Sequence, residues 1–306
     1  MVTPEPEEDA KELKLAMKGV GTDEKAIIKI VSNRTNAHLQ KVRSSYKSIY
    51  QEDIIEDLKS ELSGDLKDTI IALFYEPIEY DCHQLNKAMK GLGTDEDTLI
   101  EIIGTRPGWM IKNIRTKYIE MFDQDLVEQV ESETSGSFKK LLVSLLQGNR
   151  SENNCPNIDK CKQDADDLYK ATEGWNTDES VFNKIFVTRS PMELAYIAKY
   201  YREYKGNSIL KTIEDEFSGD TEKLYKAIVH AVINPSEYFA KRINEAIKGV
   251  GTNENLLIRV VVTRGEIDMP LIKQYYKKLF NKDMIEDIKD DTSGDFQDLL
   301  VELVSH

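Results

Sequence analysis

Residues 17–23 read Met-Lys-Gly-Val-Gly-Thr-Asp, and near copies of this stretch occur three more times in the chain. The four copies of its Gly-x-Gly-Thr core, one with Asn in place of the second Gly, begin at Gly19, Gly91, Gly174 and Gly249. An acidic residue follows each Thr after 39 positions, and a Ser-Gly pair begins two residues beyond that acid. A single Gly-x-Gly is weak evidence, but four copies in register with a distant acid indicate one type of site built four times.

The spacing of these copies divides the 306 residues into four repeats of about 70 residues each. We expect a short tail at 1–9, repeats at 10–77, 82–149, 165–233 and 240–304, and a linker at 150–164. The segment 148–156 reads Gly-Asn-Arg-Ser-Glu-Asn-Asn-Cys-Pro, which is the composition of a linker. This longest connection predicts that the repeats form two pairs, one on each side of it.

Apolar residues inside a repeat follow a helical period. After Thr22 the apolar positions fall on one face of a helix, at Ala26, Ile27, Ile30 and Val31. Alternation typical of strands is scarce, so the sequence predicts an all-α fold. Five helices are expected in the first repeat, over 8–18, 22–32, 36–49, 51–62 and 64–74. Pro77 and Pro235 should stop the last helices of repeats one and three.

The chain carries a formal net charge of −14, from 55 acidic and 41 basic residues. This charge argues against nucleic acid as the main partner, because phosphate backbones are bound by basic surfaces. It also argues against unaided binding to anionic lipid, whose surface attracts Lys and Arg. Contact between this protein and an anionic phosphate therefore needs a cation between the two.

The sequence contains no recognisable membrane-spanning or secretory segment. No run of 18 apolar residues occurs, and the acidic N-terminus lacks the basic and apolar regions of a signal peptide. We therefore expect a cytoplasmic protein. Export by a route that does not use a signal peptide stays open. Three cysteines are too few for a disulfide framework, so unpaired thiols are expected. A Cys155–Cys161 bridge in an oxidising compartment is the alternative.

The repeated loop has the chemistry of a calcium site. Glycine permits positive φ, so the chain can turn tightly and direct several carbonyl oxygens to one side. Carbonyl oxygens suit Ca²⁺, and the acid 39 residues further on can close the ring if the helices fold back. Three carbonyls and one bidentate carboxylate leave room for water or a lipid phosphate, because Ca²⁺ takes six to eight oxygens. The alternative is a helix-ending turn with a solvated acid, which the fourfold repetition disfavours.

Other calcium and phosphate motifs are missing from the sequence. The loops lack the Lys and Ser/Thr of a phosphate-binding P-loop, and no His-Glu-x-x-His motif occurs. An EF-hand loop is also absent. We therefore expect no enzymatic activity.

The stretches Met17 to Asp23, with Glu61, and Met89 to Asp95, with Glu133, match the repeat signature of the annexin family, which the chain resembles over nearly its whole length. The resemblance implies four repeats of five helices arranged as a curved disc with calcium loops on the convex face. It also implies Ca²⁺-dependent binding to phospholipid.

The resemblance further implies ligands position by position, as three backbone carbonyls and one carboxylate per repeat. These are Met17, Gly19, Gly21 and Glu61; Met89, Gly91, Gly93 and Glu133; Thr172, Gly174, Asn176 and Glu216; and Ile247, Gly249, Gly251 and Asp291.

Repeat three departs from this pattern because Asn176 replaces the second glycine. Asn tolerates the left-handed region better than most residues, so we expect a usable site there. Trp175 at the loop tip is a poor core residue, and exposed Trp favours the membrane interface. We expect Trp175, with Val20, Leu92 and Val250 at the other tips, to contact the membrane. Packing of Trp175 against its own repeat without Ca²⁺ is the alternative.

Two further sets of residues recur. The acids two residues after each Thr can close secondary calcium sites or simply favour a helix N-terminus, and are Glu24, Glu96, Glu179 and Glu254. The arginines twelve residues after each Thr should pair with helix-end carbonyls or an internal acid, with phosphate binding as the alternative, and are Arg34, Arg106, Arg189 and Arg264. The family also has a polar passage between repeat pairs, whose matching residues we interpret as a hydrated salt-bridge network, with ion conduction as the alternative: Asp81, Glu101, Arg106, Arg259 and Asp268.

We therefore expect a non-catalytic protein that binds anionic, phosphatidylserine-like membranes through several Ca²⁺ ions. Several weak sites on one face would give a steep response to calcium. A monomer in solution is expected, with lateral assembly on the membrane left open. The alternative is a helical-repeat scaffold that binds only protein partners.

Overall fold

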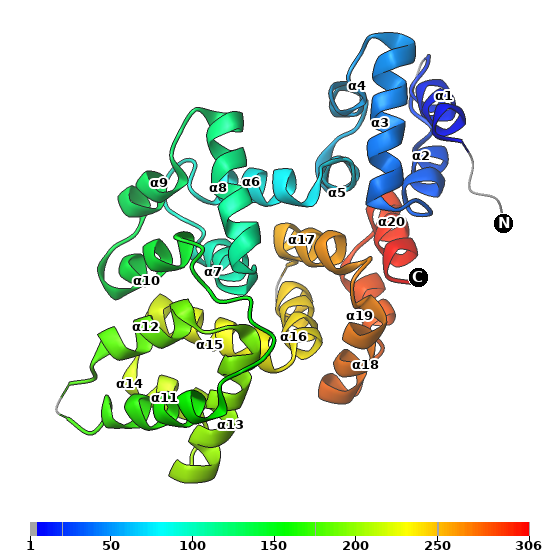
Figure 1. Ribbon diagram of the computed structural model, residues 1–306. Helices are drawn as coiled ribbons and strands as arrows, with labels where there is room; N and C mark the ends of the chain where they lie inside the picture. The colour runs from blue at the N-terminus through cyan, green and yellow to red at the C-terminus, as the bar shows by residue number, and fades with distance from the viewer. Residues whose placement is uncertain (1–4, 20, 175, 250, 306) are drawn as a thin grey trace. The chain divides into compact units, whose positions relative to one another are not determined.

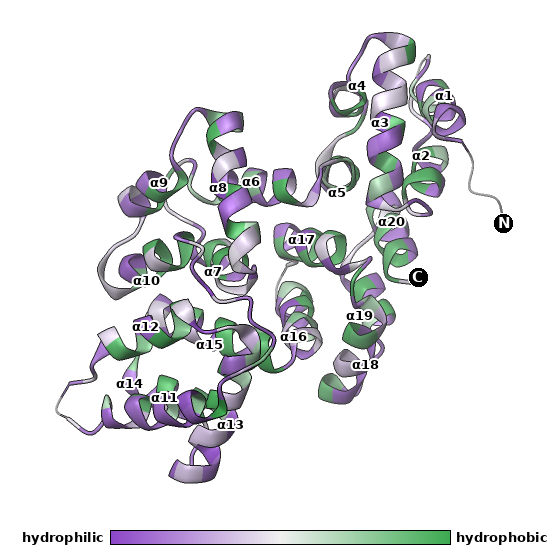
Figure 2. Ribbon diagram, viewed as in Figure 1, coloured by the Kyte–Doolittle hydropathy of each residue, from purple (hydrophilic) through white to green (hydrophobic). Residues whose placement is uncertain are grey.

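The computed structural model describes residues 5–19, 21–174, 176–249 and 251–305. These residues form twenty α-helices and no strand, five helices in each repeat, as Figure 1 shows. The prediction of an all-α protein with four five-helix repeats is confirmed. Polar and apolar residues lie on different faces of single helices (Figure 2), as expected for helices that bury one side.

The helices of repeats one and two are α1 (Pro6–Ala16), α2 (Glu24–Val31), α3 (Asn36–Tyr50), α4 (Ile54–Glu61), α5 (Gly64–Phe74), α6 (Pro77–Ala88), α7 (Glu96–Thr105), α8 (Gly108–Phe122), α9 (Leu126–Glu133) and α10 (Gly136–Leu146). Those of repeats three and four are α11 (Ile158–Lys170), α12 (Glu179–Thr188), α13 (Pro191–Lys205), α14 (Ile209–Glu216), α15 (Gly219–Ile233), α16 (Pro235–Ile247), α17 (Glu254–Arg264), α18 (Met269–Phe280), α19 (Met284–Asp291) and α20 (Gly294–Ser305).

The first helix begins earlier than expected, inside the segment predicted as a tail. Pro6 occupies the start of α1, and Glu7, Glu8 and Asp9 lie in its first turn. Proline suits the first helical position and acids suit the positive end of the helix dipole, so these residues begin a helix. The fifth helices of repeats one and three end at Phe74 and Ile233, just before the prolines expected to stop them, and each proline opens the next helix.

The chain forms two compact units, and their composition corrects the predicted pairing of repeats. One unit holds residues 1–80 and 236–306, which are repeats one and four, and the other holds residues 81–235, which are repeats two and three. In the first unit α20 packs against α2 and α5, and α17 packs against α5. In the second, α7 packs against α15 and α10 packs against α12. Repeats adjacent across the long connection are therefore partners, and the expected division there is wrong.

The connection joins repeats two and three because its own residues are bound on both sides. The buried guanidinium of Arg150 donates to the carbonyls of Gly104 on α7, at 3.4 Å, and Phe186 on α12, at 3.2 Å. The backbone N–H of Ser151 donates to the carbonyl of Thr188 at 3.0 Å. Helix α11 then begins at Ile158, within the expected linker, after Asn157 accepts a capping hydrogen bond from the Lys160 N–H.

Candidate functional site

The loop between the first and second helices of every repeat is closed by the same backbone hydrogen bond. In repeat one the N–H of Asp23 donates to the carbonyl of Ala16 at 2.9 Å. The equivalent pairs, at 2.7–2.9 Å, are Asp95 to Ala88, Asp178 to Ala171 and Asn253 to Ala246. The side chain of the donor residue also caps the second helix, as Asp23 does by accepting from the Ala26 N–H at 3.0 Å. Both ends of the loop are thus held by hydrogen bonds that need no ligand.

The glycines of these loops adopt conformations that other residues rarely take. In repeat two φ is +113° at Gly91 and +89° at Gly93, and repeats one and four have nearly the same values at Gly19, Gly21, Gly249 and Gly251. This confirms the expected need for glycine. Within the described part of the chain, no donor is hydrogen-bonded to the carbonyl oxygens of these six glycines. They are therefore available as hard oxygen ligands.

The residues that open the loops anchor them in the core. The side chains of Met17, Met89 and Ile247 are all buried, so only their main chain can face the loop. Leu92, at the tip of the repeat-two loop, is fully exposed. The other three expected membrane contacts, Val20, Trp175 and Val250, lie outside the described residues.

The distant acid lies beside the loop in all four repeats. The hydroxyl of Thr22 donates to Glu61 Oε2 at 3.0 Å, and the hydroxyl of Thr94 donates to Glu133 Oε2 at 3.2 Å. Thr252 donates to Asp291 Oδ2 at 2.6 Å, and Thr177 donates to Glu216. The fourth helix of each repeat therefore folds back onto the loop, which is the condition for the acid to close the ring.

A buried tyrosine fixes each fourth helix one turn before its acid. The hydroxyl of Tyr276 donates to Asp287 Oδ2 at 2.7 Å, and Asp287 precedes Asp291 by four residues. Equivalent contacts join Tyr46 to Asp57, Tyr118 to Gln129, and Tyr201 to Thr212. We did not predict these contacts from the sequence, although the tyrosine recurs 24 residues after each loop Thr.

The contact in repeat one carries formal charge. Burial favours the neutral carboxyl of Asp57, but hydrogen bonds from Tyr46 and Lys14 outweigh it and lower the Asp57 pKa. Lys14 Nζ lies 2.9 Å from Asp57 Oδ2 and also contacts Glu52, and these hydrogen bonds raise the pKa of Lys14. The residue that fixes α4 one turn before Glu61 is thus the ionised carboxylate of Asp57, which accepts hydrogen bonds from Tyr46 and Lys14.

Repeat three differs in its loop. Neither Gly174 nor Asn176 has a positive φ, so the expected left-handed conformation at Asn176 is not adopted. The hydroxyl of Thr172, the first residue of its expected ligand set, donates to the Tyr169 carbonyl at 2.8 Å. Repeat three therefore shares the Thr–acid contact with the other repeats but not their glycine geometry.

The recurring arginines pair with internal aspartates, which confirms their structural interpretation. Arg106 donates from Nε and Nη2 to both carboxylate oxygens of Asp81, at 2.8 and 2.9 Å, and Arg34 and Arg189 bind Asp9 and Asp164 in the same way. In repeat four the equivalent of these aspartates is Phe239, whose ring lies 4.4 Å from the guanidinium carbon of Arg264. Arg264 instead pairs with Asp268 at 2.8 Å.

The residues matched to a polar passage belong to different units. Asp81, Glu101 and Arg106 lie in the unit of repeats two and three, and Arg259 and Asp268 lie in the other. Asp81 and Asp268 each bind an arginine of their own unit, and Asp268 also accepts a 2.7 Å hydrogen bond from Ser236.

The remaining candidate residues are the loop acids and the cysteines. The acids proposed for secondary calcium sites, Glu24, Glu96, Glu179 and Glu254, each begin a second helix, the position of a helix-terminal acid. The secondary calcium sites stay a prediction. Within the described residues, Cys82, Cys155 and Cys161 form no disulfide bond, as expected. The described residues include no cluster of three or more His, Cys, Asp or Glu side chains suited to a metal, and no helix that could cross a bilayer.

The chain matches the protein-family model of annexin over residues 8–73, 80–145, 163–228 and 238–303. It is 46% identical to human annexin A13 over 297 residues, which cover 97% of this chain and 94% of the relative. It is 44% identical to human annexin A7, covering 97% of this chain but 61% of the longer relative.

Solved structures give the same result. Annexin III superposes with a TM-score of 0.97 at 38% identity, covering all of this chain and 95% of that one. Calcium-bound annexin (Sm)1 superposes with a TM-score of 0.90 at 32% identity, covering 98% and 90%. Four matched repeats and relatives of this similarity establish that the chain belongs to the annexin family.

Proposed function

We propose that this protein binds anionic phospholipid membranes through Ca²⁺ ions held in the loops of repeats one, two and four. Calcium-dependent phospholipid binding is characteristic of the annexin family. The ligands would be the carbonyls of Met17, Gly19 and Gly21 with Glu61; Met89, Gly91 and Gly93 with Glu133; and Ile247, Gly249 and Gly251 with Asp291. The observation that carries the proposal is the Thr–acid hydrogen bond, which brings one carboxylate to each glycine loop.

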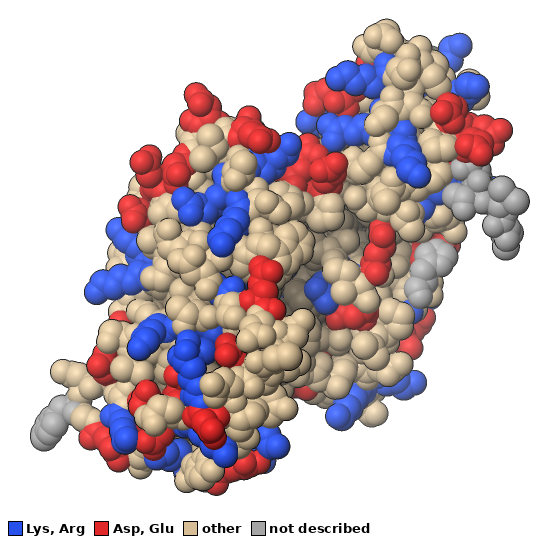
Figure 3. All heavy atoms as spheres, in the orientation of Figure 1, with Lys and Arg blue, Asp and Glu red and all other residues tan. Residues whose placement is uncertain are grey.

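The proposed sites would be incomplete without an outside oxygen. Three carbonyls and one carboxylate supply fewer oxygens than the six to eight that Ca²⁺ takes. Water or a lipid phosphate would fill the rest, so each site should bind Ca²⁺ weakly alone and better at a membrane. The net charge of −14 makes the ion necessary, because the protein would otherwise be repelled by anionic lipid. Acidic and basic side chains mix over the face drawn in Figure 3, which offers no wholly basic surface instead.

Repeat three would hold Ca²⁺ less readily. Its ligand set would be Thr172, Gly174, Asn176 and Glu216, but its loop lacks the positive-φ glycines of the other three. Calcium binding there would require the loop to change conformation, and the free energy of that change lowers the affinity. Val20, Leu92, Trp175 and Val250 would contact the lipid beside the bound ions.

The protein would act without catalysis, as a cytoplasmic monomer that calcium recruits to the membrane surface. Three sites that engage together would respond steeply to calcium through avidity. A scaffold that binds only proteins is the competing function, and it gives the spaced acids no role.

Co-sedimentation with vesicles containing phosphatidylserine tests this proposal as Ca²⁺ is raised from chelated to millimolar levels and chelated again. Pelleting should be reversible, absent with purely neutral lipid, and lost in the triple variant Glu61→Gln, Glu133→Gln, Asp291→Asn. The control triple variant Glu8→Gln, Glu131→Gln, Asp290→Asn removes three charges from exposed helix positions and should pellet like the wild type. No pelleting of the wild type at any Ca²⁺ level would overturn the proposal and favour the scaffold.

A further inference from the structure

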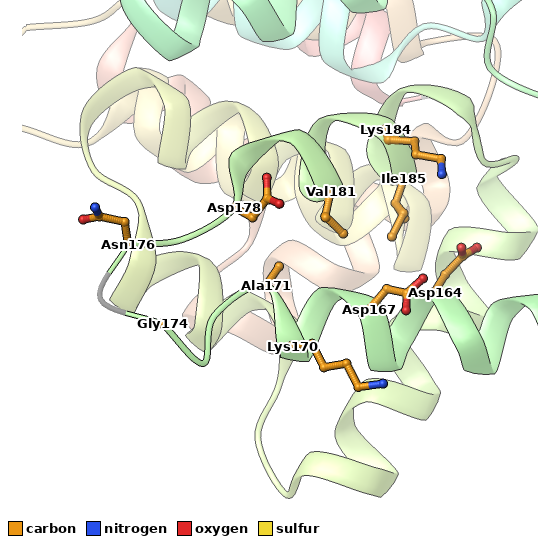
Figure 4. A pocket seen from close by; sticks show the side chains of 10 residues that line it. All are labelled: Asp164, Asp167, Lys170, Ala171, Gly174, Asn176, Asp178, Val181, Lys184 and Ile185. Carbon is orange, nitrogen blue, oxygen red and sulfur yellow. The ribbon is translucent and has the colours of Figure 1, made fainter.

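A pocket of about 410 Å³ lies between α11 and α12, directly behind the loop of repeat three (Figure 4). This volume is typical of small-molecule sites. Its walls carry both charges and apolar groups, and the lining residues are Asp164, Asp167, Lys170, Ala171, Gly174, Asn176, Asp178, Val181, Lys184 and Ile185.

Three of the five charged lining side chains are engaged by partners within the protein. Asp164 is held by the Arg189 guanidinium. Lys170 forms an ion pair with Asp166 at 2.7 Å. Asp178 accepts from the N–H of Ser180, at 3.0 Å, and from its hydroxyl, at 2.6 Å, and these hydrogen bonds lower the Asp178 pKa.

The other two charged side chains, Asp167 on α11 and Lys184 on α12, are opposite in sign and extend toward the same end of the pocket in Figure 4. Asp167 accepts from the Gln163 amide through Oδ1, at 2.8 Å, and its Oδ2 has no donor among the described residues. The Lys184 ammonium has no ion pair within the described chain, and none joins it to Asp167. One acceptor and one cation therefore flank the pocket without neutralising each other.

We propose that this pocket binds a small zwitterion of the aminoalkyl phosphate class, with its ammonium on Asp167 and its phosphate on Lys184. Charge-assisted hydrogen bonds are the strong ones, and a pair of opposite sign selects a ligand that carries both charges. The apolar side chains of Val181 and Ile185 would contact the carbons that join the two groups. A phosphate without an ammonium would meet Asp167 as a repelling charge.

The same chemistry is present in a soluble aminoalkyl phosphate and in the headgroup of phosphatidylserine. Gly174, Asn176 and Asp178 line the pocket and also belong to the proposed membrane-facing loop, so a lipid headgroup could reach it. That source rests on the proposed membrane function, whereas binding of the soluble compound does not.

The soluble arm measures binding of O-phosphoserine to the full chain by calorimetry with Ca²⁺ chelated. The wild type should bind O-phosphoserine more tightly than 3-phosphoglycerate, which keeps the phosphate and the carboxylate but has a hydroxyl in place of the ammonium. Asp167→Asn and Lys184→Met should each weaken O-phosphoserine binding about tenfold, the effect of one charge-assisted hydrogen bond in an open site. Glu12→Gln and Lys29→Met change the same charges at the equivalent positions of repeat one and should leave binding unchanged.

The membrane arm compares the Ca²⁺ concentration for half-maximal pelleting with phosphatidylserine and phosphatidylglycerol, which carry equal net charge, although only phosphatidylserine has an ammonium, together with a carboxylate that balances it. The wild type should need less Ca²⁺ with phosphatidylserine, and Asp167→Asn should abolish that difference while leaving phosphatidylglycerol binding unchanged.

Loss of soluble binding alone in Asp167→Asn would identify a free zwitterion as the ligand. Loss of lipid discrimination alone would identify the headgroup. If Asp167→Asn changes neither, or the wild type neither binds O-phosphoserine nor discriminates between the lipids, the pocket assignment is overturned. Failure of all Ca²⁺-dependent pelleting would instead overturn the membrane function and leave the soluble arm to decide this proposal.

Discussion

The hydroxyl of Thr22 donates to Glu61 Oε2 at 3.0 Å, across 39 residues of chain. The other three repeats have the same contact, so a neutral hydroxyl holds each acid beside its loop. The carboxylate keeps further lone pairs for a metal, because Thr occupies only part of its acceptor capacity. Folding thus orders the acid before any ion arrives, which reduces the entropy lost on binding.

Thr94→Val should therefore raise the Ca²⁺ concentration needed for half-maximal vesicle binding by a few-fold. Valine keeps the branched shape but cannot donate to Glu133, so the carboxylate must be ordered when Ca²⁺ binds. Thr116→Val serves as the control, because among the described residues this exposed hydroxyl donates only to the Lys112 carbonyl of its own helix. Equal Ca²⁺ titrations for the two variants would show that the Thr–acid contact has no positioning role.

Gly91→Ala should destabilise the protein by about 1 kcal/mol, and Gly174→Ala by less. A Cβ at Gly91 would meet nothing within 4 Å, so its cost comes from the backbone at φ +113°. Gly174 has no such φ, and its Cβ would meet two backbone atoms of Asn176, the carbonyl oxygen at 3.4 Å and the nitrogen at 3.8 Å, both ordinary contacts. Urea unfolding of the two variants compares these costs. A larger loss for Gly174→Ala would contradict the loop conformation of repeat three.

Tyr276→Phe should lower the free energy of unfolding by about 1–2 kcal/mol, because it removes the hydrogen bond to the Asp287 carboxylate and the one accepted from the Asn244 amide. Asp287 would keep its contact with Lys282, at 3.0 Å, but lose the link to α18 that holds α19 in place. The Ca²⁺ concentration at which the repeat-four loop fills should also rise, since Asp291 is the last residue of α19. Tyr275→Phe changes the neighbouring ring, whose hydroxyl has no hydrogen bond recorded among the described residues, and should be close to neutral in both assays.

Asp9→Asn should remove a contribution to the free energy of unfolding that is present at neutral pH and lost in acid. Burial favours the neutral form of Asp9, but hydrogen bonds from Arg34 and His38 outweigh it and hold the Asp9 pKa below its ordinary value of 3.8. Because the folded pKa is the lower one, the ionised carboxylate stabilises the fold above about pH 4. That contribution is lost as pH falls through the folded pKa.

The wild type should accordingly exceed Asp9→Asn by about 2 kcal/mol at pH 7 and by progressively less below pH 4. Denaturant unfolding across this pH range measures the difference. Glu8→Gln removes the same charge from an exposed position of α1 and should not reproduce it. A difference that stays constant with pH would mean that Asp9 acts through packing rather than through its charge.

The sequence alone determined the helical class, the four repeats and the position of each acid beside its loop. These features follow from local or periodic information: glycine where φ must be positive, apolar residues at helical spacing, and Thr and acid at one constant separation. The internal pairing of the arginines also follows from the sequence, but the identity of the partner, an Asp 25 residues earlier in three repeats, comes from the structure.

Tertiary structure alone decided which repeats are partners and how the fourth helix is anchored. Repeats one and four share a unit because α20 packs on α2 and α5, and helical periodicity says that a face is apolar without saying which face covers it. Arg150 looked like part of a linker, yet it binds two repeats together through carbonyls that every residue possesses. Phe239 stands where the other three repeats have an aspartate, so Arg264 pairs with Asp268 instead. Only the packing of the Arg264 guanidinium over the Phe239 ring explains this difference.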